Sequence, residues 1–314
     1  MARILFLMMF PFMCFSQITP SEDIPVNNLL KEKENLDTKR KASYNLDEIK
    51  VRWKKAALEN CPGVPCVVTP PAPSFTCGTS TVTDVDGNVY NTKLIGSSQC
   101  WMTSNLKVTK YNDGTVIGDS TNSTWGTAAI GARTENKEPG APPSTSVSGY
   151  VGTFGYLYNW YAVNDPRKLC PDGWRVPSDS DWNKLVISLH SGTTPADTST
   201  SCTSSCTQSL TAGAVMKSIA TNTTAGSGLG WDPATPTPSP GTNTSGFSAL
   251  PAGDRSSFSS NFRNLREFAT FWSSSMVPPP SSEAWHRSLG YNNDGVEKDS
   301  SAPGSGYSVR CLKN

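Results

Sequence analysis

The sequence is poor in the residues on which most enzymes and nucleic-acid-binding proteins depend. Only two of its 314 residues are histidine, and charged residues make up 17% with a formal net charge of +1. No basic block is present, so we do not expect nucleic acid as a partner. Beyond residue 16 no stretch is apolar enough to span a membrane. The sequence is instead rich in glycine (25) and proline (24), which is typical of a loop-rich extracellular protein.

Motifs for catalysis and for metal binding are also missing. The sequence contains no Gly-x-Ser-x-Gly elbow and no phosphate-binding loop. His190 and His286 do not stand at ligand spacing from a cysteine pair, so we predict no zinc and no other cofactor. Asp84 and Asp86 lack the further ligands of an EF-hand and are interpreted as a turn. We therefore predict a protein that is not an enzyme. A hidden pair of catalytic carboxylates, which needs no motif, stays open as the alternative.

Composition divides the chain into four segments. Residues 1–16 have a basic Arg3 before a short apolar run, which predicts a secretory signal peptide. Residues 17–60 are rich in Lys and Glu and predict a short helical N-terminal arm. Residues 61–76 are rich in proline and predict a stiff linker. Residues 77–314 are predicted to form the folded domain.

The cysteines predict a disulfide framework. Of the nine cysteines, Cys14 lies in the predicted signal peptide, which leaves eight. A lipoprotein attached through Cys14 is the alternative to cleavage. An even number in an exported chain favours disulfides over metal ligation. Spacing along the chain suggests four pairs, namely Cys61–Cys66, Cys77–Cys100, Cys170–Cys311 and Cys202–Cys206.

Residues 169–182 (LCPDGWRVPSDSDW) combine a turn with the start of a helix. Ser178 is predicted as the helix N-cap, with the acidic Asp179 and Asp181 in the first turn. Apolar residues follow at helical spacing, namely Trp182, Leu185, Val186 and Leu189. We expect this helix to bury one face at the centre of the domain.

Short strands are predicted on both sides of this helix. Residues 81–85 and 89–95 flank an Asp-Gly-Asn turn and predict a hairpin. Residues 268–275, 284–289 and 308–312 are predicted as strands near the C-terminus. The predicted fold class is α+β, loop-rich and stabilised by disulfides.

Several motifs in series resemble one known family. In chain order they are TVTDVDGNVYNTKLIGSSQCWMTSNL, GYLYNWYAVN, CPDGWRVPSDSDW, GFSALPAGDR, FWSSS and GYSVRCLKN. Over about residues 79–313 they look like the Fibrobacter succinogenes major paralogous (FISUMP) domain, found in secreted and surface proteins of Fibrobacteres and Bacteroidetes. The resemblance implies export and an extracellular, cell-surface location. It implies no particular biochemical activity.

A more distant similarity concerns the fold. Residues 173–182 are similar to the R-L-P-T-x-x-E-W stretch of formylglycine-generating enzymes, which have a C-type-lectin-like fold. The resemblance implies a helix that is disulfide-linked to the last strand, in agreement with Cys170–Cys311. It also implies that Trp272 and Trp285 lie where lectin-like folds present a binding surface. The late cysteine pair of those enzymes and the calcium signature of C-type lectins are both missing, so we carry over neither activity nor metal.

Two functions are compatible with these patterns. The first is a non-catalytic binding or adhesion protein that recognises carbohydrate or another surface ligand through exposed Trp272 and Trp285. Asn292, Asn293 and Asp294 form the nearest oxygen-rich cluster, which reads most simply as a turn. The alternative is a structural subunit of a surface appendage or envelope assembly, in which the N-terminal arm makes homo-oligomers or filaments. Ser120 is a candidate for O-glycosylation, because Asp-Ser-Thr resembles short Bacteroidetes glycosylation sites.

Overall fold

The computed structural model describes most of the domain and none of the N-terminal arm. The described residues are 74–96, 98–119, 125, 129–137, 150–191, 205–219, 230–231, 239, 241–259 and 261–314. The predicted signal peptide, arm and most of the linker, as well as Ser120, lie outside them. Residues 75–314 form one compact unit. Within the described ranges, no helix is both long and apolar enough to cross a membrane.

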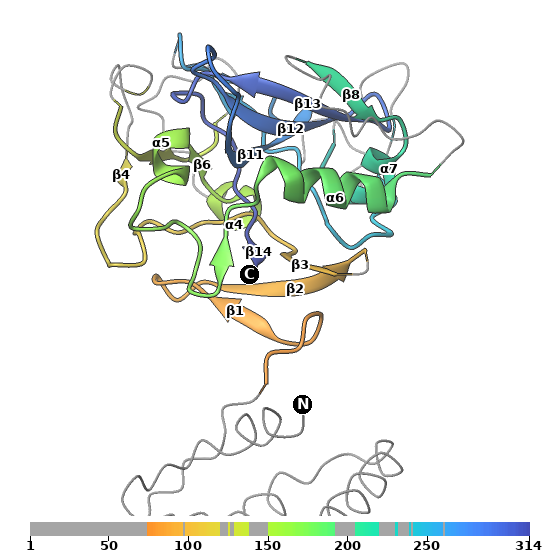
Figure 1. The fold of residues 1–314 in the computed structure, drawn as a ribbon, viewed down its shortest axis with the longest axis horizontal. Coiled ribbons are helices and arrows are strands. Elements are labelled where there is room, and N and C mark those ends of the chain that lie inside the picture. The colour runs from red at the N-terminus through yellow and green to blue at the C-terminus, as the bar shows by residue number, and fades with distance from the viewer. Residues whose placement is uncertain are drawn as a thin grey trace, which may run out of the picture. The chain divides into compact units, whose positions relative to one another are not determined.

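A five-stranded antiparallel sheet brings the two ends of the domain together (Figure 1). In spatial order its strands are β1 (Thr81–Thr83), β2 (Val89–Ile95), β3 (Gln99–Met102), β14 (Leu312–Lys313) and β7 (Trp174–Arg175). The last strand lies between the third strand and a strand from the middle of the chain. The Asp84 carboxylate accepts hydrogen bonds from the backbone N–H of Asp86 and Asn88 in the β1–β2 turn, as expected for a turn and not a metal loop.

A second sheet of four strands carries the middle and the C-terminal part of the domain. Its spatial order is β11 (Phe268–Met276), β12 (Ala284–Gly290), β13 (Val296–Ser301) and β8 (Cys206–Ser209). Helix α6 (Asp179–Leu189) lies along one face of this sheet (Figure 1). Sheet and helix enclose one of the two main hydrophobic clusters.

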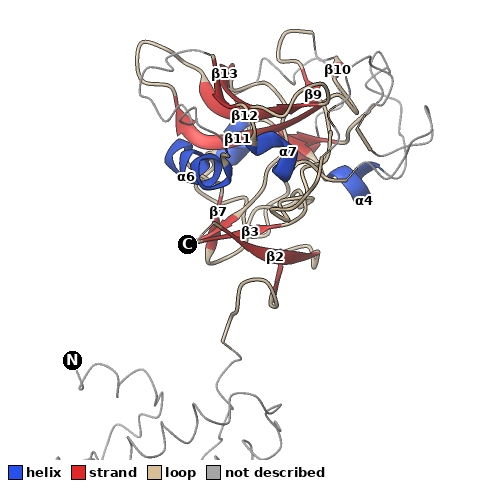
Figure 2. Cartoon of the chain, turned by 90° about the vertical axis from the view of Figure 1, so that its right-hand side faces the viewer, coloured by secondary structure: helices blue, strands red, loops and turns tan. Residues whose placement is uncertain are grey.

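The remaining elements are short. They are the strands β4 (Gly118–Asp119), β5 (Ala132–Thr134), β6 (Leu157–Tyr158), β9 (Asp254–Arg255) and β10 (Phe262–Arg263), with helices α4 (Tyr150–Phe154), α5 (Trp160–Val163) and α7 (Ala212–Met216). Figure 2 shows how small the helical share is. The fold is therefore mostly β with few helices, whereas the predicted class was α+β.

Helix α6 begins where its sequence predicts. The Ser178 Oγ accepts from the backbone N–H of Asp181 at 3.2 Å, and the Asp181 carboxylate accepts from the backbone N–H of Ser178 at 2.9 Å. This capping box satisfies two N–H groups that a helix start would otherwise leave unpaired. Trp182, Leu185 and Val186 are fully buried, which confirms the predicted apolar face.

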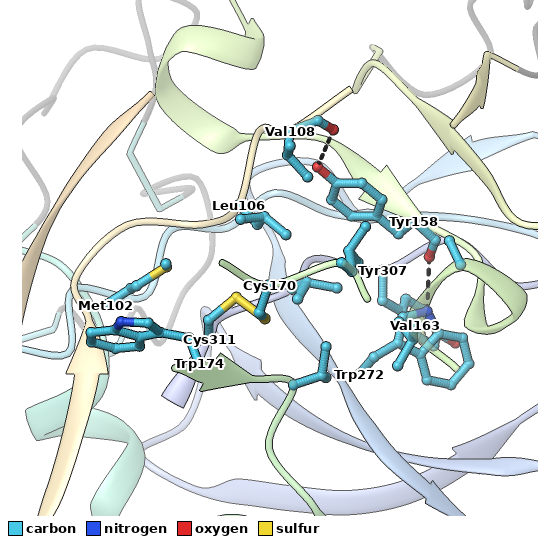
Figure 3. Close-up of a cluster of buried hydrophobic side chains, with 14 of the residues drawn as sticks. Met102, Leu106, Val108, Tyr158, Val163, Cys170, Trp174, Trp272, Tyr307 and Cys311 are labelled. Carbon is cyan, nitrogen blue, oxygen red and sulfur yellow. Dashed lines mark hydrogen bonds between the residues drawn. A yellow bond between two sulfur atoms is a disulfide. The ribbon is translucent and has the colours of Figure 1, made fainter. Parts of the chain in front are cut away.

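The structure contains the disulfides Cys77–Cys100 and Cys170–Cys311, two of the four expected pairs. The second lies in the core among aromatic and aliphatic side chains (Figure 3). Cys206 is also disulfide-bonded, and its expected partner Cys202 lies outside the described residues. Cys61 and Cys66 lie outside them as well. The two disulfides described hold the five-stranded sheet at its start and at its end.

We expect the two disulfides to differ in their contribution to stability. Replacing Cys170 and Cys311 together by alanine opens a link with a sequence separation of 141 residues, whereas Cys77–Cys100 spans 23. Chain-entropy arguments give about 5 and about 3 kcal/mol for loops of these sizes. Urea unfolding of the two double variants measures both losses. A larger loss for the Cys77/Cys100 variant would contradict this expectation.

Candidate binding site

The two tryptophans expected to face a ligand are buried, and this part of the expectation is wrong. Trp272 is 0% exposed, and its Nε1 donates to the Tyr158 carbonyl at 2.8 Å (Figure 3). Its ring packs against that of Tyr307 with the centroids 4.5 Å apart. Trp285 is 5% exposed and lies under the Lys298 ammonium, 4.1 Å from the ring centroid. Neither ring offers a free face for stacking on a sugar.

The strand register also separates the tryptophans from the asparagine cluster. Trp272 pairs with His286, near the start of β12, whereas Asn292 follows the end of β12. The five residues of extended chain from Trp285 to Gly290, the end of β12, span roughly 17 Å, and the turn follows them. The expected ligand-binding residues therefore form two groups, and only the second lies at the surface.

The second group is the turn between β12 and β13. Asn292, Asn293 and Asp294 are exposed, and we call these three residues the Asn-Asn-Asp turn. The Asn293 Oδ1 accepts from the backbone N–H of Gly295 at 2.8 Å, and its Nδ2 donates to the Asn292 Oδ1 at 3.1 Å. The sequence-based interpretation as a turn is confirmed, and local hydrogen bonds restrict its side chains.

Helix α7 supports this turn through a glycine. The Gly213 N–H donates to the Asp294 carbonyl at 2.8 Å. A Cβ built on Gly213 would lie 2.2 Å from the Gly295 oxygen and 2.7 Å from the Asp294 oxygen, which is closer than atoms can approach. Glycine at this position therefore lets the helix backbone touch the turn directly.

Four residues later, Lys217 supports the turn from the C-terminal end of α7. Its side chain is 0% exposed. Its Nζ donates to the carbonyls of Ser239 at 2.5 Å, Asn293 at 2.7 Å and Gly290 at 3.2 Å. The Asp294 carboxylate lies 3.8 Å from the ammonium. One buried cation thus joins the turn and the end of β12 to a separate segment of chain.

Burial lowers the pKa of the Lys217 ammonium to about 8, although the nearby Asp294 carboxylate acts in the opposite direction. Taking a charge out of water disfavours the charged form, and this effect of burial outweighs that of Asp294. Lys217 is consequently protonated at neutral pH, within reach of its titration under mildly alkaline conditions.

An aromatic side chain precedes the turn. Tyr291 is half-buried and packs edge-on against Phe268, with ring centroids 6.2 Å apart. Its backbone N–H donates to the Glu267 carbonyl at 2.9 Å, and its carbonyl accepts from the Ser239 N–H at 2.9 Å. The surface here combines amide and carboxylate groups with part of an aromatic ring.

The model of the Fibrobacter succinogenes major domain matches residues 95–313. The chain belongs to this family. The match confirms the principal resemblance seen in the sequence, and it includes both Lys217 and the Asn-Asn-Asp turn. No curated protein and no solved structure matches the chain. Membership of the Fibrobacter succinogenes major domain family brings no assigned reaction or ligand with it.

One buried cluster in this family domain resembles part of a hydrolase site. The His286 Nε2 lies 3.1 Å from the Ser301 Oγ, which lies 2.8 Å from the Tyr307 hydroxyl. Burial lowers the pKa of His286 to about 3, so the imidazole is neutral and a weak base. Its Nδ1 has no partner in the described structure, whereas a catalytic triad needs an acid there to orient the ring. We interpret the cluster as core.

A second polar cluster links α6 to the four-stranded sheet. The Asp179 carboxylate pairs with the Arg287 guanidinium at 2.8 Å and with the Lys298 ammonium at 2.9 Å. From the sequence we expected Asp179 to interact favourably with the positive end of the helix dipole. Its carboxylate also neutralises the charges of Arg287 and Lys298 on the four-stranded sheet. No three His, Cys, Asp or Glu side chains gather as metal ligands in the described ranges.

Sequence reasoning missed Lys217. The residue stands in the stretch AVMKSI, where a single lysine interrupts apolar residues in a short predicted element. That interruption is the only sequence signal of a buried ammonium, because the partner carbonyls are 22 to 76 positions away.

Gly213→Ala should displace the Asn-Asn-Asp turn from α7. The added methyl group would clash with backbone oxygens, so we expect a stability loss of about 1–3 kcal/mol, as is typical for overpacking. Changed amide chemical shifts at residues 292–295 would accompany it in an NMR spectrum. Gly152→Ala is the matched control, because that helical glycine has open space around it. Equal stability of the two variants would contradict this account.

Lys217 should make the stability of the domain rise with pH above 8. Its pKa is about 8 in the folded state against an ordinary 10.5, so the unfolded chain holds this proton over a pH range where the folded chain has lost it. This difference in pKa corresponds to a gain in the free energy of unfolding of at most about 3 kcal/mol. Measured by urea unfolding, the stability difference between the wild type and Lys217→Met should therefore increase from pH 8 to 10.5. A flat or falling difference would disprove the assignment.

Proposed function

We propose that this protein is a secreted, non-catalytic binding protein of the cell surface that recognises carbohydrate through the Asn-Asn-Asp turn. The observation that carries the proposal is a polar turn held in one shape by buried contacts. Gly213 and Lys217 hold its backbone, while Asn292 and Asp294 stay exposed. Polar groups fixed before binding lose little conformational entropy when they hydrogen-bond to hydroxyl groups.

Tyr291 supports a sugar rather than a purely polar ligand. Its half-buried ring lies directly beside the turn and is fixed by its contact with Phe268. Sugar rings have apolar C–H faces and hydroxyl edges, and they suit a surface that pairs an aromatic ring with amides and carboxylates. Protein ligands with similar side chains remain the second class to test.

The extracellular location is part of the proposal. Disulfides persist in oxidising compartments, and the structure has Cys77–Cys100 and Cys170–Cys311. We also propose a C-type-lectin-like arrangement of the domain. It is supported by the link from Cys170, before α6, to Cys311, beside the last strand.

A glycan array probed with the oxidised full chain tests the function. We expect the variant with both Asn292→Ala and Asp294→Asn to bind at least about tenfold more weakly, or ~1.4 kcal/mol. Asn293 is left intact in this variant because its side chain holds the Gly295 N–H. Asn91→Ala, an exposed amide on β2, is the control and should bind like the wild type.

Two results would overturn this proposal. One is glycan binding that survives in the Asn292/Asp294 variant, which would place the ligand elsewhere. The other is that the protein binds no glycan on the array and forms oligomers, as measured by light scattering. The second result would favour the alternative, a structural subunit of a surface assembly.

A further inference from the structure

We propose that Lys217 is the positioning residue of this binding site, a tethered cation that orders the Asn-Asn-Asp turn in the way a bound metal ion orders a calcium loop. This inference rests on the proposed function, because it names what holds that site in its binding shape. The ammonium lies where three backbone carbonyls and one carboxylate converge.

The convergence of carbonyls is what requires a group with several N–H donors. The oxygens of Ser239, Gly290 and Asn293 all point at one buried position, where their negative ends repel each other unless a donor separates them. Buried acceptors left without a donor are costly, so loss of the ammonium would drive the carbonyls apart or admit water. Gly290 ends β12 just before the turn and Asn293 lies within it, so separation of their carbonyls would displace the turn from the end of the strand.

The distances identify a hydrogen-bonded ammonium rather than a metal site. Nζ–O separations of 2.5, 2.7 and 3.2 Å match N–H···O bonds, two of them longer than the 2.3–2.6 Å of calcium–oxygen contacts. The lysine ammonium is covalently part of the chain, so the turn needs no metal ion from solution. Ligand binding at this turn should therefore be unaffected by a chelator.

The ammonium also makes the turn sensitive to pH. Among the described residues, Asp294 is the charged group that acts on Lys217. The described residues Ser239, Trp231 and Ala249, which also contact Lys217, are uncharged. Burial puts its pKa at about 8. Above this pH the neutral Lys217 amine has only two N–H donors for the three carbonyls. The third carbonyl then faces the nitrogen lone pair, which cannot donate a hydrogen bond. The hydrogen bonds at the turn should therefore rearrange as Lys217 loses its proton.

Chemical rescue provides the test. Lys217→Ala removes the equivalent of one propylammonium ion, so added propylammonium can refill the space while neutral propanol cannot. The readouts are the amide chemical shifts of residues 292–295 in the ¹⁵N-labelled full chain, and the affinity for the best glycan of the array. Lys217→Met and the exposed Lys184→Met serve as second variant and matched control.

We expect Lys217→Ala and Lys217→Met to shift these amides and to weaken glycan binding at least tenfold, with Lys184→Met unchanged. Propylammonium should restore the shifts of Lys217→Ala. If Lys217→Ala fails to fold, the wild-type amides should titrate with a midpoint near pH 8, which needs no variant. Addition of EDTA should change neither readout.

The outcomes separate this inference from the proposed function. Unchanged turn amides in folded Lys217 variants, or equal rescue by propanol, would overturn the positioning role even if the wild type binds glycans. Absence of glycan binding by the wild type would refute the proposed function, whereas the amide shifts would still decide the role of Lys217.

Discussion

The domain depends on one stretch of backbone, residues 306–313, that connects its two main sheets. The Ser308 carbonyl accepts from the Trp272 N–H at 3.1 Å in the four-stranded sheet. The Cys311 carbonyl accepts from the N–H of Met102, the last residue of β3 in the five-stranded sheet, at 3.1 Å. The Val309 carbonyl accepts from the N–H of Leu106, just after that strand, at 2.8 Å. Both hydrophobic clusters include residues of this C-terminal stretch, with Val309 and Cys311 in one and Leu312 in the other. Such long-range pairing has to overcome a large loop-closure entropy, which the disulfide to Cys170 reduces in the unfolded chain.

Arg310, within the same stretch, shows how the domain treats buried positive charge. Its guanidinium is fully buried and donates to the Asn105 Oδ1 at 2.5 Å and to the carbonyls of Phe247 and Ser248, with no carboxylate among these partners. Burial lowers its pKa to about 9, so it is charged at neutral pH. Lys217 is held by the same means. Backbone carbonyls in loops lack the partners that helices and sheets supply, and a buried cation can bind several of them at once.

Local patterns made part of this structure predictable. The β1–β2 hairpin, the capping box of Ser178 and the apolar face of α6 depend on residues within a few positions of each other, so spacing alone indicates them. Trp272 shows the limit of such reasoning. Alternation along a strand says which residues share a face, yet only the topology places Tyr307 and Tyr158 over that face. Lys217 was beyond prediction for the same reason, because its partners come from three segments that only the folded chain brings together.

The support of the Asn-Asn-Asp turn consists mainly of backbone atoms. Gly213 bonds to the Asp294 carbonyl, and Lys217 bonds to the carbonyls of Gly290 and Asn293. Backbone groups are the same whatever side chain a residue carries. The side chain of Asn292 can therefore change with little effect on the framework, whereas Gly213 and Lys217 cannot. This separation between a fixed base and an exchangeable surface lets one scaffold present different ligand-contacting groups, which is a physical reason to look for the ligand at this turn.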